Sequence, residues 1–266
     1  MTRAVMNTLS ATIEGIGFWS NGLPDWAAAR AFVRDGALPE GAPARPSPQL
    51  LAPNERRRAP DTVAVALEVA LAACTNAGRD PRTLPSVFAS THGDLGITDY
   101  MCATLAADPR SISPTRFHNS VHNAAAGYWT IGAGCTEATT AISAYDATFA
   151  EGLIEALVQL ASGEEAVLLV GYDGGAAGPL SPMAKSAGLL GGALVLSRTA
   201  KADAPRIEVT MRQGDTPAND ARLSGVAGGN AMAQMLPLFE ALANARGDVR
   251  LFAGRERTLH VGIAHG

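Results

Sequence analysis

Asp146 is one of two aspartates at positions that suit a nucleophile. It follows the stretch 138–143 (ATTAIS), which predicts a strand, and it lies near the start of a helix predicted over 144–161. Such a turn can activate a nucleophile, because the helix N-terminus lowers the pKa of a thiol and its backbone N–H groups stabilise an oxyanion. A carboxylate is a poor nucleophile there, and its acyl product would be a reactive anhydride. Asp146 also suits a helix N-cap or a first-turn acid.

Asp173 is the second such aspartate, within the sequence 171–175 (GYDGG). This spacing imitates the glycine-flanked nucleophile of hydrolases, which sits on a turn leading directly into a helix. Here the following residues, 176–179 (AAGP), predict a loop, and no GxSxG sequence occurs. A stand-alone thioester hydrolase or acyltransferase that uses Asp146 or Asp173 is therefore kept as an alternative function.

The three cysteines do not form a catalytic or metal-binding pattern. Cys135 precedes the predicted strand 138–143 and comes about ten residues too early for the turn. Cys74 and Cys102 lie on helical patterns, where they are most simply small buried hydrophobic residues. An odd, scattered set without CxxC predicts a reducing compartment and no disulfide framework.

His118 and His122 have the i, i+4 spacing of metal ligands on one helical face. Position 119 is Asn, however, where the HExxH motif has Glu, and no third ligand is evident. We therefore expect no metal and place both histidines at an interface. The sequence 15–17 (GIG) lacks the third glycine of the dinucleotide fingerprint, so we expect no cofactor.

The elements that would position these residues alternate between strands and helices. Strands are predicted over 12–18, 86–90, 138–143, 166–172, 192–197, 206–211 and 259–263. Helices are predicted over 24–35, 61–77 (capped by Asp61), 96–107, 119–131, 144–161 and 231–245. The central strands are apolar throughout, and no helix separates the strands near 189–197 and 205–211, which we expect to pair. The pattern predicts a layered α/β sandwich with a mixed sheet, in a single domain over 1–266 with an exposed Pro/Ala-rich loop at 36–60.

The formal net charge of −4 disfavours nucleic acid as a partner, because phosphate binding needs a basic face. The dense basic run Arg56, Arg57 and Arg58 is either a solvated helix start or a docking patch for an acidic carrier protein. The sequence has no stretch of about 18 apolar residues and no apolar core near its N-terminus. We therefore expect no membrane segment, no signal peptide and a cytoplasmic protein.

Several segments, taken in order, resemble the N-terminal half of a β-ketoacyl-acyl carrier protein synthase, a ketosynthase of the thiolase fold. They are 12–17 (TIEGIG), 85–94 (PSVFASTHGD), 113–134 (SPTRFHNSVHNAAAGYWTIGAG), 162–171 (SGEEAVLLVG) and 188–198 (GLLGGALVLSR). The resemblance covers roughly residues 10–200. The variant that it resembles most is the short ketosynthase-like subunit of aryl polyene pathways, which is paired there with a complete ketosynthase as its chain-length factor. The tail 227–265 also suits that short form.

The resemblance implies that catalysis is lost. Counting back from 162–164 (SGE) places Asp146 where the family has its nucleophilic Cys. The two catalytic histidines of a ketosynthase come from a second half, and this sequence ends at Gly266 before such a half. The chain is therefore expected not to be an enzyme by itself. It would act as a non-catalytic chain-length factor that pairs with a full-length ketosynthase and meets an acyl carrier protein transiently.

The resemblance also places the strand 138–143 at a pseudo-two-fold axis against that ketosynthase. The candidates for the interface or for the wall of the acyl tunnel are Phe117, His118, His122, Tyr128, Trp129, Tyr145 and Phe149. Ordinary core packing is the alternative for the aromatic residues. An isolated half of this fold should leave an apolar face uncovered, which favours an obligate partner. A homodimeric protein that binds acyl carrier protein remains a further alternative.

Overall fold

The computed structural model describes residues 8–217 and 222–265, and this part of the chain contains one eight-stranded sheet in the order β3-β2-β4-β5-β1-β6-β8-β7. The strands are β1 (Leu9–Ser20), β2 (Ser86–Ala89), β3 (Thr139–Ile142), β4 (Ala166–Asp173), β5 (Leu190–Ser197), β6 (Arg206–Gln213), β7 (Asp248–Phe252) and β8 (Arg257–Ala264). The helices are α1 (Trp26–Asp35), α2 (Pro53–Arg58), α3 (Asp61–Ala77), α4 (Leu95–Ala107), α5 (Pro114–Asn119), α6 (Ala124–Ala133), α7 (Thr148–Ser162), α8 (Arg222–Ala227) and α9 (Leu236–Ala243). Two 3-10 turns matter below, η3 (Tyr145–Ala147) and η5 (Ala231–Met235).

The sheet is mixed, as predicted. Strands β3, β2 and β4 are parallel, whereas β5 runs antiparallel to β4 and to β1. Strands β6, β8 and β7 continue the sheet as an antiparallel ribbon beyond β1. The expected pairing of the strands near 189–197 and 205–211 is wrong, because β1 lies between β5 and β6. Local patterns do not reveal this insertion, since β1 comes from the opposite end of the described chain.

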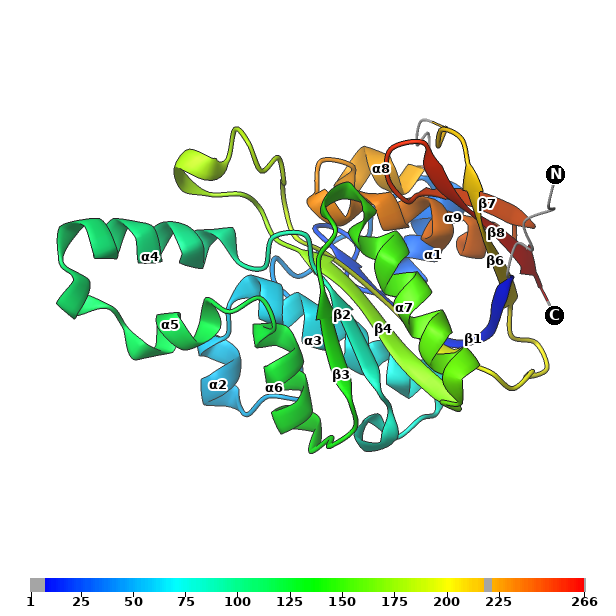
Figure 1. Cartoon of the computed structure of the whole chain (residues 1–266), viewed down its shortest axis with the longest axis horizontal. Helices are drawn as coiled ribbons and strands as arrows, with labels where there is room; N and C mark the ends of the chain where they lie inside the picture. The colour runs from blue at the N-terminus through cyan, green and yellow to red at the C-terminus, as the bar shows by residue number, and fades with distance from the viewer. Residues whose placement is uncertain (1–7, 218–221, 266) are drawn as a thin grey trace, which may run out of the picture.

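Helices cover both faces of the sheet (Figure 1). Helices α3 and α6 pack on one face, whereas α1, α7 and α9 pack on the other. Strand β4 is buried on both sides: Val167 and Leu169 enter the core under α7, and Leu168 and Val170 enter the core under α3. This explains why its sequence is apolar without alternation.

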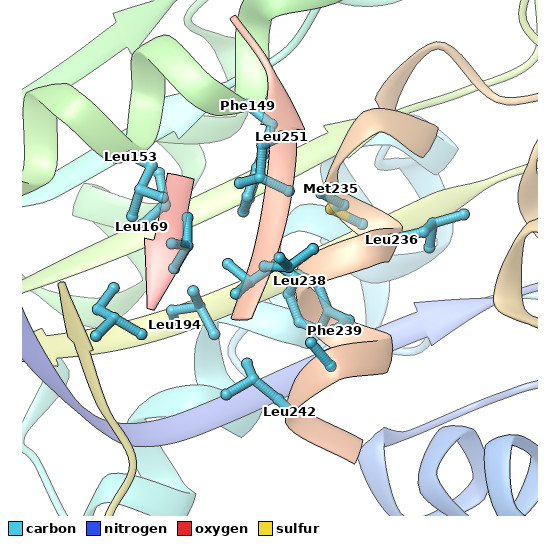
Figure 2. Packing of buried hydrophobic residues seen from close by; sticks show 14 of the residues in the cluster. Phe149, Leu153, Leu169, Leu194, Met235, Leu236, Leu238, Phe239, Leu242 and Leu251 are labelled. Carbon is cyan, nitrogen blue, oxygen red and sulfur yellow. The ribbon is translucent and has the colours of Figure 1, made fainter. Parts of the chain in front are cut away.

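The core under α7 joins the sheet to the C-terminal segment (Figure 2). Phe149 and Leu153 of α7 lie in one cluster with Leu169 of β4 and Phe239 of α9. The rings of Phe149 and Phe239 are 6.3 Å apart, and the ring of Phe18 lies 5.5 Å from Phe239. The segment after β6 therefore completes a core that β1 to β5 leave open.

Glycines let α3 approach β1 closely. A Cβ atom at Gly17 would lie 2.0 Å from the carbonyl oxygen of Val69, and one at Gly15 would lie 2.2 Å from that of Ala73. Atoms at such distances overlap, so only glycine allows this packing. The GIG sequence therefore serves helix–sheet contact.

Several predicted elements differ in detail. The predicted helix 119–131 corresponds to α6, which begins only at Ala124 after a turn at residues 120–123, and the short helix α5 before that turn was not predicted. The segment 36–60 is not entirely an exposed loop, since it contains α2 and since Leu51 and Ala59 are buried. Asp61 is not the cap of α3: the N-cap is Pro60, and the Asp61 side chain accepts hydrogen bonds from Arg45 instead.

Strand β7 and helices α2 and α8 were not predicted. No helix within residues 8–217 and 222–265 has both the length and the apolar character needed to cross a membrane. Residues 1–7, on which the expectation of no signal peptide partly rests, lie outside the described residues.

Candidate functional site

The strand-to-helix turn predicted around Asp146 is present. Strand β3 ends at Ile142, η3 follows, and α7 begins directly after it. Tyr145, the first residue of η3, has a φ of 52°, in the left-handed region. The Thr148 hydroxyl donates a hydrogen bond to the Tyr145 carbonyl (2.5 Å) and accepts one from the Ala144 N–H (2.9 Å). Thr148 thus holds the turn from inside the fold, where it is buried.

Asp146 is exposed in this turn. It is not the N-cap of α7, because that position is Ala147 and no side chain there accepts a capping hydrogen bond. Asp146 instead lies in the first turn of the helical segment, where the positive end of the helix dipole favours a carboxylate. Its place after β3 and before α7 is the one predicted from the sequence.

Asp173 is buried at the end of β4 and organises the loop that follows β2. Its carboxylate accepts hydrogen bonds from the Ser90 hydroxyl (2.7 Å) and from the backbone N–H groups of Thr91 (2.9 Å) and His92 (3.2 Å). Burial raises the pKa of Asp173 above its usual value, and these donors oppose the shift. The strand continues through Asp173, so GYDGG does not form a nucleophile elbow, and the alternative that used Asp173 loses its geometric basis.

An Asp173→Asn variant should be less stable than the wild type by ~1–3 kcal/mol at low pH, because an amide cannot accept all three hydrogen bonds. The folded protein holds the Asp173 proton to a higher pH than the unfolded chain, in which the pKa is about 3.9. The free energy of unfolding of the wild type therefore falls as the pH rises above about 3.9, because the folded protein binds this proton more tightly than the unfolded chain. The variant has no proton at this position and lacks this dependence.

The stability difference between these two proteins should shrink as the pH rises above about 4, the pKa range of an unfolded Asp. Urea titrations at several pH values measure it, with Asp203→Asn in an exposed turn as the matched control. A difference that grows with pH would contradict the raised pKa.

The two histidines do not share a helical face. His118 lies in α5, and His122 lies in the turn before α6. The His122 Nε2 atom is 2.8 Å from the Ser90 carbonyl oxygen, so this ring joins the same loop as Asp173. The His118 ring packs edge-on against Tyr128, with the centroids 6.1 Å apart. The part of the chain that the structure describes contains no group of three residues that could hold a metal ion.

The aromatic candidates divide into surface and core residues. Tyr145 and Phe117 are 80% and 61% exposed, whereas Trp129 and Phe149 are 0% and 1% exposed. Trp129 packs beside Phe88 under α3, and Phe149 packs under α7. Both side chains belong to the core of this chain, as the core-packing alternative predicts. Tyr128 is half-buried.

Several exposed apolar side chains lie on the segments that precede and follow β3 in the chain, from α4 to the loop after β4. They are Leu105 on α4, Phe117 on α5, Val121, Ile131 on α6, Tyr145, and Leu180 and Met183 in the loop after β4. We call these seven residues the β3-edge face. Figure 1 shows α4, α5 and the loop 176–188 projecting from the body on the same side as α6. A cavity of about 340 Å³ between α2, α5 and α6 is lined by Val121, Tyr128 and Ile131, among others.

The arginine run lies on α2, not on a loop. The Arg56 guanidinium donates a hydrogen bond to the Leu51 carbonyl (2.9 Å), and that of Arg57 donates one to Asn54. Arg57 and Arg58 are exposed, whereas Arg56 is half-buried. Arg56 thus anchors the helix, and the charges of Arg57 and Arg58 face solvent.

Sequence reasoning missed most of the β3-edge face and the role of Thr148. Helix α4 gave a usable signal, because its sequence LGITDYMCATLAA is apolar over much of its circumference, whereas only Leu95 and Ile97 are buried. The hydrogen bonds of Thr148 gave no signal, since they depend on the conformation of the turn.

A family model described as the N-terminal domain of beta-ketoacyl synthases matches residues 26–258. The chain belongs to this family. No curated protein matches it. Among solved structures, this ketosynthase-like domain is similar to a chain of the ketosynthase (ApeO) in complex with its chain length factor (ApeC) from Xenorhabdus doucetiae. The TM-score is 0.75 at 22% identity, over 96% of this chain and 99% of that one.

Two other complexes contain chains similar to this ketosynthase-like domain. The ishigamide ketosynthase/chain length factor matches with a TM-score of 0.71 at 15% identity, over 97% of this chain and 99% of that one. The type II polyketide synthase complex AntDE:AntF, an acyl-carrier protein with its ketosynthase, matches with a TM-score of 0.73 at 11% identity, over 98% and 100%. These matches show the thiolase-like α/β fold predicted from the sequence.

Proposed function

We propose that the chain is a non-catalytic, chain-length-factor-like subunit. It pairs with a full ketosynthase in fatty-acid- or polyketide-type chain elongation, of the aryl polyene kind, and it shapes the acyl tunnel. The observation that carries this proposal is Asp146, which is exposed at the turn between β3 and α7. By the resemblance to ketosynthases, this is the position of their nucleophilic Cys. A turn from a strand into a helix can present a nucleophile. The carboxylate at this position is a poor nucleophile, however, and its acyl product would be a reactive anhydride.

The β3-edge face supports an obligate partner. Strand β3 pairs with β2 on one side only, so the backbone groups of its other side are open to another strand. Exposed apolar side chains lie on the segments before and after this strand in the chain, and exposed apolar surface is a common feature of protein interfaces. Pairing of β3 with the matching strand of a ketosynthase would satisfy the open backbone edge of β3, and the partner surface would cover these apolar side chains.

The solved complexes support the identity of the partner. Three of them contain chains that this chain covers over 99–100% of their length, and their descriptions name ketosynthases, chain length factors and an acyl-carrier protein. In the proposed complex Phe117, His118, Tyr128 and Tyr145 remain candidates for the interface or tunnel wall. Arg57 and Arg58 remain candidates for transient docking of the acidic carrier protein.

Asp146 variants test the catalytic part of the proposal. Asp146→Ala should leave condensation by the complex within about twofold of the wild type, because no bond is made to this side chain in the proposed role. Asp146→Cys should not turn the isolated chain into a condensing enzyme, because none of its five histidines lies in the family's catalytic motifs. Condensation is measured by mass spectrometry of the carrier-bound products.

Co-expression with a ketosynthase tests the partner. The tagged chain should retain the ketosynthase through size-exclusion chromatography as a heterodimer. A stable homodimer that excludes the ketosynthase would favour the homodimeric carrier-binding alternative. Thioester hydrolysis by the purified chain that is lost in Asp146→Ala would favour the stand-alone enzyme.

A further inference from the structure

Tyr145 has a backbone conformation that its residue type disfavours. Among the described residues, only Asp203, Ala245 and Glu256 share a positive φ without being glycine, and Tyr145 is the only aromatic residue of the four. A bulky L-residue is uncommon in the left-handed region, because its Cβ crowds the neighbouring backbone. Glycine would form the same turn without this cost.

The fold maintains this conformation through a dedicated contact. Thr148 is buried, and its single hydroxyl binds the Tyr145 carbonyl and the Ala144 N–H together. The turn also contacts η5, and the Ser143 hydroxyl ties its start to the Thr91 carbonyl (3.0 Å). Strain that the surroundings maintain in this way is typical of functional sites.

The strained backbone does not place the Tyr145 ring in the core. The ring is almost fully exposed, and it has no aromatic partner within the described part of the chain. It therefore contributes little to the stability of this chain alone. The contrast with Phe149, four residues later and fully buried in α7, shows that the turn directs one aromatic side chain outward and the next inward.

We propose that Tyr145 is the side chain with which this chain closes the acyl tunnel of its ketosynthase partner, and so sets the longest product. This inference rests on the proposed function. The turn projects Tyr145 from the end of β3, the strand expected at the partner interface, next to the position that holds the nucleophile in a ketosynthase. A flat, apolar ring is suited to meet the terminus of an aliphatic or conjugated acyl chain, since both surfaces lose water on contact.

Ring size at position 145 is the variable to test. The complex of each variant with the ketosynthase is supplied with carrier protein and malonyl extender units, and the carrier-bound products are measured by mass spectrometry. Tyr145→Gly should lengthen the main product by at least one two-carbon unit, and Tyr145→Trp should shorten it. Tyr145→Phe should leave it unchanged, because the ring and not the hydroxyl fills the space. Leu38→Ala is the control, since Leu38 is an exposed apolar residue in the loop after α1, outside both the turn and the β3-edge face.

The outcomes separate the two proposals. If the wild-type chain does not co-purify with the ketosynthase, both fail. If the wild-type complex forms and Tyr145→Gly gives the same product length, only the role of Tyr145 is overturned. If Tyr145→Gly does not bind the partner, Tyr145→Trp decides: shorter products support the inference, and an unchanged length overturns it. The melting temperature of isolated Tyr145→Gly should also rise, because glycine relieves the left-handed strain.

Discussion

An Ile131→Asp variant is expected to remain folded and to lose its ketosynthase partner. Ile131 is 80% exposed on α6, so its replacement removes no core contact from the isolated chain. In the proposed complex this side chain would be buried, and a carboxylate there would be desolvated without a charge partner. We expect the dissociation constant to rise by about 100-fold, equivalent to ~3 kcal/mol, measured by titration calorimetry or by loss of the heterodimer peak.

Val158→Asp is the matched control for Ile131→Asp. Val158 is 44% exposed on α7 and does not belong to the β3-edge face. Its replacement introduces the same charge and should leave the affinity within about twofold of the wild type. Equal loss of binding in both variants would show that added charge, and not the β3-edge face, controls association.

A Gly17→Ala variant should lose a large part of its stability. The new Cβ would lie 2.0 Å from the Val69 carbonyl oxygen, so β1 and α3 must move apart. Strand β1 pairs with β5 along most of its length, which prevents a local shift. We expect a loss of ~3 kcal/mol or more, or a melting temperature lower by about 10 °C for a chain of this size. Differential scanning calorimetry measures it.

Gly127→Ala is the opposite control. Gly127 lies within α6, and an added Cβ there would meet no atom within 4 Å. The substitution should therefore stabilise the protein by ~1 kcal/mol, because alanine favours a helix more than glycine does. A destabilisation equal to that of Gly17→Ala would contradict the close approach of β1 and α3 as the cause.

The sequence predicted the elements whose burial is continuous. Strand β4 and helix α3 were found because their apolar patterns reflect packing within a few residues of each position. The start of α6 was placed too early, because residues 119–123 also fit a helical pattern although they form the end of α5 and a turn. The pairing of β1 with β6 was missed for another reason, since strand order depends on contacts across about 200 residues.

The candidate site was predicted in position but not in conformation. The count from 162–164 placed Asp146 at the turn, because the length of α7 is a local property. The left-handed backbone conformation of Tyr145 and the hydrogen bond from the Thr148 hydroxyl to its carbonyl depend on the three-dimensional form of the turn, which no local sequence pattern specifies. The hydrogen bonds to Asp173 come from a loop about 80 residues away, which no local pattern connects to β4.

The insertion of β1 between β5 and β6 affects how the chain reaches its fold during synthesis. Strand β1 is synthesised before the other strands of this sheet, but its two neighbours are residues 190–197 and 206–209. The backbone groups of β1 therefore have no sheet partner, and its apolar side chains stay uncovered, until about 180 further residues have been synthesised. Strand pairings between residues so far apart in sequence slow folding, and the intermediates that precede them expose apolar surface and are prone to aggregate. Chaperones, or a partner already present in the cell, would have the most to contribute during that interval.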